Sequence, residues 1–238
     1  MDSPILIVKD IYSGYDDVPV IHGISLNVMK GELVSIVGAN GAGKTTTIRT
    51  IAGLMHPTKG SVSFLGEDIS CVSAHQILRK GISYVPEGRH LFPKLSVLKN
   101  LSLGAYAEKN RNEINKLLAE VFSLFPILEK RTDQVAETLS GGQQQMLAIA
   151  RGMMSHPKLL MLDELSLGLM PSLVEKVMET ISRINRRGMT VLLVEQRVEE
   201  ALEISHRSYV IQTGRIVQSG LAQDLMNSAE IRKAYMGM

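Results

Sequence analysis

Residues 38–46 read GANGAGKTT and match the pattern G-x-x-x-x-G-K-S/T. An apolar run at 33–37 precedes this stretch, and a run compatible with a helix, 46–54, follows it. Glycines permit backbone angles and close approaches that a side chain would block, so successive N–H groups can point into one concavity. This order of strand, loop and helix predicts a loop that holds phosphate oxygens rather than a plain glycine-rich turn.

Two side chains of the loop extend the prediction to a nucleotide with a metal. Lys44 brings a positive charge to the outer phosphates, and the Thr45 hydroxyl suits a hard cation such as Mg²⁺. The N-terminus of the following helix adds about half a unit of positive charge. We therefore expect a bound nucleoside triphosphate with magnesium. The residues expected to contact the nucleotide are Gly38, Ala39, Asn40, Gly41, Ala42, Gly43, Lys44, Thr45 and Thr46.

The composition narrows the class of protein. A chain of 238 residues with 45% hydrophobic and 21% charged residues is globular and can bury one large core, with or without a smaller lobe. Its 26 basic and 24 acidic residues are well mixed, and it has no Trp to stack on single strands. We therefore expect no nucleic-acid partner. The single cysteine, Cys71, suits a reducing compartment.

The sequence also indicates where in the cell the protein is located. The first residues lack the order of a signal peptide, since Asp2 and Pro4 stand where its charge and helix should be. The apolar runs at 159–162 and 191–194 have four residues each, far fewer than the roughly 20 of a membrane helix. We expect a protein that stays inside the cell and reaches a membrane only through another protein.

Hydrophobic patterns predict a small N-terminal sheet and an inserted helical lobe. Strands are expected at 5–8 and 24–28, with Tyr15 in a loop between them, and the pattern around Tyr15 favours an ordinary packed surface aromatic. Residues 96–125 change to helical spacing without interleaved strands, and Pro126 ends this run. The expected parts of this single domain, 1–238, are an α/β core with a β-subdomain at about 1–87 and 156–238 and a helical subdomain at 88–155.

The stretch LSGGQ at 139–143 precedes a helical run at 144–154. Ser140 stands in a capping position, and the two glycines leave the first N–H groups of the helix open. The pattern alone favours a capped helix, and an anion site at the same helix end is the alternative.

Two apolar strands each end in a pair of polar residues. Residues 159–162 are apolar throughout, as in a parallel strand covered on both faces, and Asp163 and Glu164 follow them. Asp163 can hold magnesium through water beside the phosphate loop, and Glu164 can accept a proton from an attacking water. A second buried strand, 190–194, ends in the same way at Glu195-Gln196.

The C-terminal part has its own local signals. Ser172 and Glu175 have the spacing of a capping box for a helix that runs to Arg187. The turn Thr213-Gly214 predicts a hairpin. Two short helices are then expected up to Met238.

Together these pieces resemble the ATP-binding subunits of ABC transporters along essentially the whole chain. The similar segments are the Walker A loop at 38–45, the signature at 139–143, Walker B at 159–163 and the D-loop at 166–169. The stretches VPEGR at 85–89, SLGLMP at 166–171, VEQ at 194–196 and IRKAYMG at 231–237 are most similar to the second ATPase subunit of branched-chain amino acid importers. Importers of urea and short-chain amides have close relatives of this subunit.

The resemblance implies a P-loop NTPase core with a mainly parallel sheet, an N-terminal antiparallel β-subdomain and an inserted α-helical subdomain. It implies that two such domains close head to tail. The signature residues that would then face the γ-phosphate held by the other copy's Lys44 are Ser140, Gly141, Gly142 and Gln143. It also places Tyr15 on adenine, Glu164 as catalytic base and Ser166 in the D-loop. The Glu87 loop and the helical lobe would grip a membrane-spanning subunit.

Three residues depart from the common ABC pattern. Glu87 stands where most members have a Gln that contacts magnesium, Gln196 takes the place of the switch histidine, and Leu165 replaces a Pro. Without the metal, Glu87 would repel the γ-phosphate by about 4 kcal/mol for unit charges about 4 Å apart at an effective dielectric of about 20, which predicts strong magnesium dependence. Gln196 can still donate to a phosphate oxygen but cannot titrate. Leu165 frees a backbone N–H and is expected to loosen its turn.

The resulting hypothesis is an ATPase that uses ATP and Mg²⁺ to drive branched-chain amino acid import from the inner face of the cytoplasmic membrane. Its expected partners are a second ABC subunit, two permease subunits and, indirectly, an amino-acid-binding protein. The alternatives are a urea or amide importer subunit, a lipid exporter subunit, and a soluble ABC switch that acts on nucleic acid or ribosomes.

Overall fold

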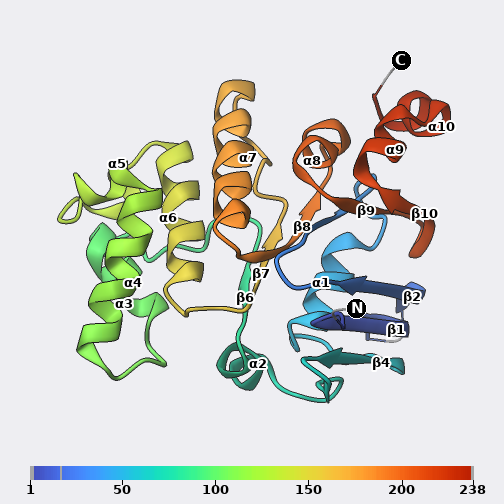
Figure 1. Ribbon diagram of the computed structural model, residues 1–238, viewed down its shortest axis with the longest axis horizontal. Helices are drawn as coiled ribbons and strands as arrows, with labels where there is room; N and C mark the ends of the chain where they lie inside the picture. Colours follow the sequence, from blue (N-terminus) through green and yellow to red (C-terminus); the bar gives the residue numbers. More distant parts are fainter. Residues whose placement is uncertain (1–2, 17, 237–238) are drawn as a thin grey trace.

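The computed structural model describes residues 3–16 and 18–236 and contains two sheets (Figure 1). The strands are β1 (Leu6–Tyr15), β2 (Val18–Val28), β3 (Leu33–Val37), β4 (Lys59–Phe64), β5 (Glu67–Asp68), β6 (Ile82–Val85), β7 (Leu159–Asp163), β8 (Thr190–Glu195), β9 (Arg207–Gln212) and β10 (Arg215–Leu221). The helices are α1 (Lys44–Ile51), α2 (Ala74–Lys80), α3 (Val97–Gly104), α4 (Arg111–Leu124), α5 (Pro126–Glu129), α6 (Gly141–Met153), α7 (Pro171–Arg186), α8 (Val198–Ile204), α9 (Ala222–Asn227) and α10 (Ala229–Ile231), with a 3₁₀ turn at Ala136–Thr138 and a π turn at Arg232–Met236.

The larger sheet has six strands in the order β10-β9-β3-β8-β7-β6, and all but the β9–β10 hairpin pair in parallel. Its central strands are buried on both faces, because successive side chains of a strand point to opposite sides. In β7, Leu160 and Leu162 belong to one core, whereas Leu159 and Met161 belong to the other. This confirms the prediction of a parallel strand covered on both faces.

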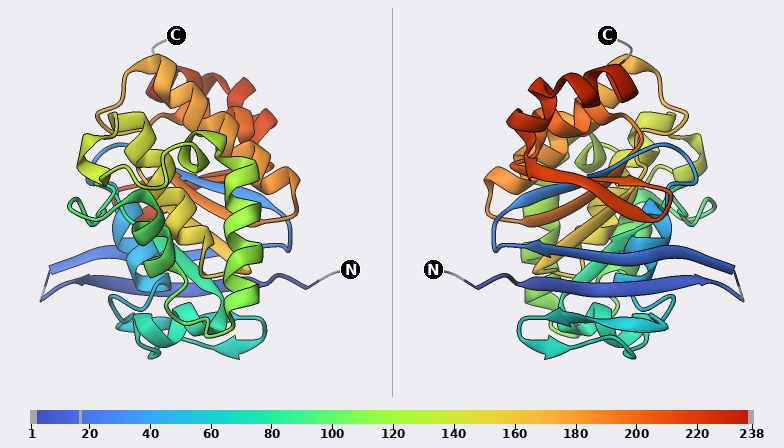
Figure 2. Two further views of the ribbon diagram at one scale, coloured as in Figure 1. Left: turned by 90° about the vertical axis from the view of Figure 1, so that its left-hand side faces the viewer. Right: turned by 90° about the vertical axis from the view of Figure 1, so that its right-hand side faces the viewer.

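Different elements cover the two faces of this sheet. Helices α6, α7 and α8 pack on the face that carries Leu160 and Leu162. Helix α1 and the smaller antiparallel sheet, with strand order β2-β1-β4-β5, cover the opposite face. Figures 1 and 2 show the smaller sheet at one end of the molecule and α3, α4, α5 and α6 gathered at the other. The expected fold class is confirmed, while the boundaries at 87–88 and 155–156 stay a prediction.

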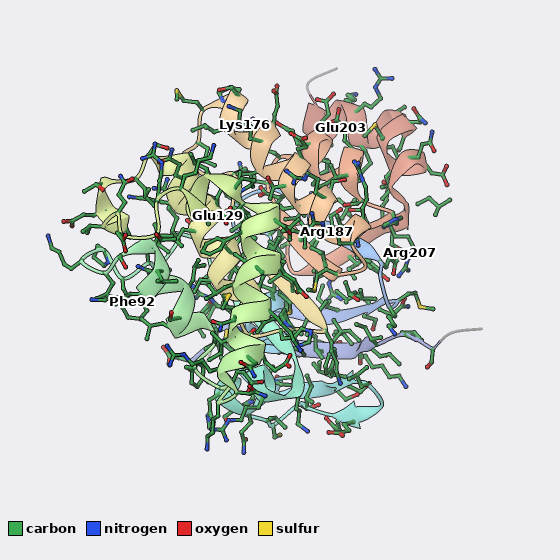
Figure 3. The ribbon with its side chains drawn as sticks, turned by 60° about the vertical axis from the view of Figure 1, so that its left-hand side comes forward. Phe92, Glu129, Lys176, Arg187, Glu203 and Arg207 are labelled. Atoms are coloured by element: carbon green, nitrogen blue, oxygen red, sulfur yellow. The ribbon has the colours of Figure 1, made fainter. Side chains whose placement is uncertain are left out.

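The outer helix faces are polar. Lys176 on α7 and Glu203 on α8 are exposed (Figure 3). Within 3–16 and 18–236, no helix combines the length and the apolar character that crossing a membrane requires.

The N-terminal strands are longer than the sequence suggested, and the loop position predicted for Tyr15 is wrong. Tyr15 is the last residue of β1 and pairs with Val18 of β2. The strand continues past its apolar start because the register shifts between Val8 and Ile11, where Asp10 adopts a left-handed φ of 46°. Such a bulge absorbs residues that break the alternation.

One predicted helix start is also wrong. Helix α7 begins at Pro171 with Met170 as its N-cap and no side-chain cap, so Ser172 and Glu175 form no capping box. Proline at the first helical position has the required φ and needs no N–H partner, so the helix starts two residues earlier than predicted. The predicted end of the helical run at Pro126 is confirmed, since α4 stops at Leu124 with Phe125 as its C-cap, and Pro126 additionally begins the short helix α5. Of the C-terminal residues, Gly237 and Met238 lie outside the described part.

Candidate functional site

The predicted phosphate-binding loop connects β3 to α1, and packing requires two of its three glycines, Gly38 and Gly43. A Cβ on Gly38 would lie 2.2 Å from the carbonyl oxygen of Ile211. Gly43, the N-cap of α1, has a left-handed φ of 106°, and a Cβ there would lie 2.9 Å from Ile21 Cγ2. Ala39, Asn40 and Gly41 are exposed at the tip. The strand–loop–helix prediction is confirmed, and the loop tip is open to a ligand.

Lys44 lies at the first position of α1 and is 3% exposed. Its Nζ donates to the carbonyl oxygens of Gly38 and Ala39, both at 2.9 Å, and lies 3.0 Å from Glu164 Oε1. The ammonium is therefore held at the centre of the loop by three oxygens. It links the loop directly to the residue that follows β7.

Asp163, the last residue of β7, is completely buried and faces α1. Its Oδ1 accepts from Thr45 Oγ1 at 3.2 Å, and its Oδ2 accepts from the Tyr84 hydroxyl at 2.8 Å. Burial raises the pKa of Asp163, although both hydroxyls oppose the rise. Burial and Asp163 likewise raise the pKa of Tyr84. Asp163 is thus not a solvated acid at a strand end.

Thr45 and Asp163 fit a magnesium ion. Neighbouring ligands of an octahedral Mg²⁺ with bonds of about 2.1 Å lie roughly 3 Å apart, close to the 3.2 Å between Thr45 Oγ1 and Asp163 Oδ1. Both are oxygen ligands, the type that Mg²⁺ prefers. In the described part of the chain no three or more His, Cys, Asp or Glu side chains form a metal-binding group. A cation here would take its other oxygens from phosphate and water.

Glu164 follows in a strained turn. Its φ of 45° is left-handed, a conformation that costs a residue with a side chain about 1–3 kcal/mol. Its N–H donates to the Val194 carbonyl oxygen at 2.9 Å. The next residue, Leu165, is 1% exposed and packs in the core. These two contacts anchor the turn, and the loosening expected from leucine in place of proline stays a prediction.

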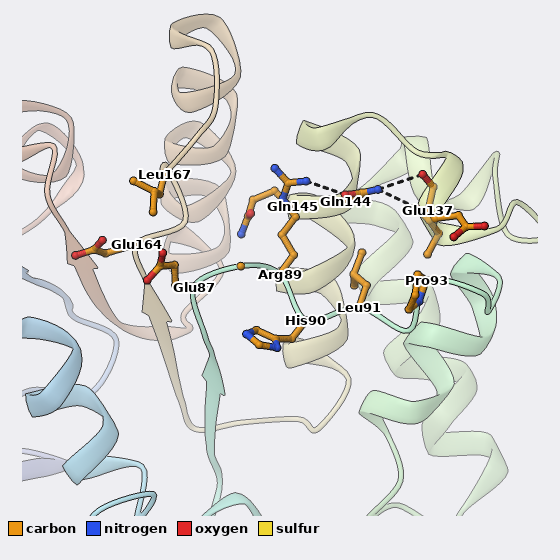
Figure 4. Close-up of a pocket in the computed structure, with 12 residues that line it drawn as sticks. Glu87, Arg89, His90, Leu91, Pro93, Glu137, Gln144, Gln145, Glu164 and Leu167 are labelled. Carbon is orange, nitrogen blue, oxygen red and sulfur yellow. Dashed lines mark hydrogen bonds between the residues drawn. The ribbon is translucent and has the colours of Figure 1, made fainter. Parts of the chain in front are cut away.

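A cleft of about 350 Å³ separates this site from the helical lobe. Figure 4 shows Glu87 and Glu164 near each other at one end of the cleft and Glu137 and Pro93 at the other. Arg89 lies between them, and its Nη1 donates to Gln144 Oε1 at 2.7 Å. Glu87 is exposed, so water screens its charge. Its repulsion of a nearby phosphate is then closer to about 1 kcal/mol than to about 4 kcal/mol.

The signature is folded as a capped helix start. Ser140 Oγ accepts from the Gln143 N–H at 3.4 Å, and Gln143 Oε1 accepts from the Ser140 N–H at 3.2 Å. This confirms the capping position of Ser140, and α6 begins at Gly141 rather than at 144. The space beside Gly141 and Gly142 is bounded by the side chains of Arg89 and Leu173.

Two further predicted residues lie near the loop. Tyr15 is 45% exposed, and its hydroxyl accepts from Arg49 Nη1 at 3.3 Å, so its ring lies beside α1. Gln196 is exposed immediately after β8, in a cleft of about 430 Å³ that Glu164, Ser166 and Glu195 also line.

Glu195 is the residue to which sequence reasoning gave no role. It is completely buried, and burial raises its pKa to about 7. Ser166 Oγ donates to its Oε2 at 2.6 Å and the Ser166 N–H to its Oε1 at 3.1 Å. The available signal was an acid at the end of an apolar strand, but the sequence did not reveal which side of the sheet it faces.

Comparison with known proteins places this geometry in a family. Residues 21–166 match the family described as ABC transporter. The branched-chain amino acid transport ATP-binding protein BraG of Pseudomonas aeruginosa is 42% identical over 94% of this chain and 95% of its own length. The lipopolysaccharide export ATP-binding protein LptB of Haemophilus influenzae is 32% identical over 98% of this chain and 97% of its own. The cassette MJ1267, solved in its ADP conformation, has a TM-score of 0.87 and 25% identity, covering 99% of this chain and 100% of that one.

The chain belongs to the ABC transporter family, as its ATP-binding subunit. It is an ATPase.

Proposed function

We propose that the chain drives the import of branched-chain amino acids through two permease subunits. The 42% identity to BraG over nearly the full length of both chains supports this substrate. The similarity to LptB, at 32%, keeps lipid export as the second candidate. ATP hydrolysis proceeds in the same way for import and for export, so the site residues do not determine the transported substrate.

The main support for ATP hydrolysis at this site is the contact between the loop and the end of β7. Lys44 Nζ lies 3.0 Å from Glu164 Oε1, and Thr45 Oγ1 lies 3.2 Å from Asp163 Oδ1. Lys44 would bind the outer phosphates of ATP and so compete with its contact to Glu164. The freed carboxylate then accepts the proton of the attacking water. Gln196, which lines a cleft together with Glu164, would donate an amide hydrogen bond to the γ-phosphate.

Magnesium would be held by Thr45 and Asp163, and Glu87, which lines the same cleft as Glu164, is the third proposed ligand. Bound there, the ion neutralises charge on the β- and γ-phosphates. The chain's own part is to fix the two ligand oxygens, which Tyr84 supports by donating to Asp163 at 2.8 Å.

The signature is proposed to act on a second subunit. Gly141 and Gly142 border Arg89 and Leu173 rather than the phosphate loop, and Ser140 is exposed. The capped start of α6 offers backbone N–H groups and the positive end of a helix to an anion, here the γ-phosphate held by the other copy. Each ATP site would then need two chains.

A groove of about 360 Å³ between the helical lobe and strand β6 is the proposed binding site for a helical segment of a permease subunit. Three of its lining side chains are unusually exposed: Phe92 at 48%, Leu103 at 41% and Tyr106 at 56%. The Arg151 guanidinium lies 5.6 Å from the Phe92 ring centre and gives the groove a cationic edge. Exposed apolar side chains grouped in this way are typical of protein interfaces.

The test is to purify the chain with its membrane subunits and reconstitute the complex in vesicles with ATP on the side of this subunit. We expect ATP-dependent uptake of leucine, isoleucine and valine, supplied with the binding protein. Uptake of urea alone, or extraction of lipid, would contradict the proposed substrate. Tyr106→Asp should weaken co-purification, whereas Val217→Asp, at a similarly exposed apolar position on β10, should not.

A further inference from the structure

The turn that presents Glu164 is fastened to the end of β8 at two successive points. The Glu164 N–H donates to the Val194 carbonyl oxygen at 2.9 Å. Two residues later, Ser166 gives both its N–H and its hydroxyl to the Glu195 carboxylate, at 3.1 and 2.6 Å. The first bond is made by backbone alone, so only the second depends on which side chains are present.

The Glu195 contact is chemically costly. A completely buried carboxylate loses the hydration of its charge, and the neighbouring charge of Glu164 adds to the unfavourable effect. A leucine would fill the space without this cost. The acid is useful only as an acceptor for two donors at once, which an aliphatic side chain cannot be.

The backbone strain at Glu164 indicates why the Ser166 N–H and hydroxyl both bind Glu195. A left-handed φ of 45° at a residue with a side chain persists only when the surroundings fix it. Between the fixed points at Glu164 and Ser166 lies Leu165, which is buried at 1% exposure. Releasing Ser166 would let the turn relax, and the Glu164 carboxylate would move relative to Lys44.

We propose that Glu195 is a positioning residue for ATP hydrolysis, which holds Ser166 and thereby fixes the direction of the Glu164 carboxylate. Because Gln196 is the next residue of the chain, the same contact joins the turn after β7 to the residue proposed to bind the γ-phosphate. The two groups that face the phosphate from these strand ends are thus set as one unit. This inference rests on the proposed role of Glu164 as the base.

The experiment compares Glu195→Gln, Ser166→Ala and the double variant in ATP affinity, kcat and melting temperature. We expect kcat to fall about 10- to 100-fold in Glu195→Gln, since a displacement of about 1 Å can have that effect. ATP affinity should stay within about twofold. The double variant should be no slower than the slower single variant, because both changes remove one contact.

Ser208→Ala is the matched control. Its hydroxyl donates to the Ser35 carbonyl oxygen and accepts from Ser35 Oγ at 2.9 Å, also fully buried in the large sheet. This variant should melt earlier with an unchanged kcat. If Glu195→Gln fails to fold, Ser166→Ala carries the test, because serine to alanine leaves the backbone bond intact.

An unchanged kcat in Glu195→Gln or Ser166→Ala would overturn the positioning role. A loss of ATP affinity as large as the loss of kcat would also overturn it. So would a double variant whose loss of kcat is the product of the two single losses. Failure here while Glu164→Gln is inactive would leave the proposed base intact. Unchanged turnover in Glu164→Gln would instead remove the base itself.

Discussion

The two central strands β7 and β8 each end in an acid that is followed by a Glu or Gln, Asp163-Glu164 and Glu195-Gln196. The two terminal acids, Asp163 and Glu195, point to opposite faces of the sheet. Asp163 faces α1 and accepts from Thr45 of the phosphate loop. Glu195 lies on the face of the sheet that α6, α7 and α8 cover, and its carboxylate accepts from the Ser166 hydroxyl. One acid therefore contacts the phosphate loop, and the other contacts the turn that carries the proposed base, Glu164.

The difference follows from register. Asp163 is opposite Val194 in the parallel pair, so Glu195 is one residue further along. A shift of one residue moves a side chain to the other side of a sheet. In β8 Val194 belongs to the α1 core and Leu193 to the helical one, which places Glu195 on the helical side. Similar sequence endings thus have different chemical surroundings.

The sharpest test of the β7 side is Glu164→Gln. Loss of a general base typically slows a reaction by about 10²- to 10⁴-fold, so kcat should fall by that order while ATP still binds. Steady-state phosphate release and equilibrium ATP binding measure the two effects. Glu203→Gln, an exposed acid on α8, is the control and should be as active as the parent. Undiminished turnover in Glu164→Gln would show that another group takes the proton.

The sequence was sufficient for the features that local chemistry determines. The phosphate loop, the buried β7, the cap at Ser140 and the β9–β10 hairpin all depend on neighbouring residues, and all were predicted. Tyr15 and α7 were misplaced because a bulge and a proline start outweighed the alternation and the capping spacing. Glu195 was left without a role because its face depends on strand register, a property of the assembled sheet.

The buried acid of β8 should appear in the pH dependence of stability. The pKa of Glu195 is raised from 4.5 to about 7 by burial, so the folded protein favours its protonated form. Its contribution is fully present below about pH 4.5 and is lost as the pH rises through about 7. Other charged groups around its cleft are Glu164, Arg197, Glu199 and Glu200.

Glu195→Gln removes this titration. The stability of the variant relative to the parent should therefore rise by about 3 kcal/mol between pH 4.5 and pH 8, measured by denaturant unfolding. A parallel course of the two pH curves would contradict the raised pKa. Greater stability at pH 8 together with a lower kcat would separate positioning from simple structural support.

The smallest expected effect concerns Gln196, which is exposed at the end of β8 and does not titrate. Gln196→His should add an inflection in kcat near about pH 6.5, with activity falling as the pH rises, because imidazolium binds phosphate more strongly than neutral imidazole. Ionisation of Glu195 has the opposite sign, since the carboxylate form accepts best from Ser166 and should raise kcat through about pH 7. Placing Gln196→His in a Glu195→Gln background leaves the histidine inflection alone. If the double variant shows no such inflection, residue 196 does not reach the phosphate. Of the residues at the ends of β7 and β8, only Glu164 would then act on the reacting groups.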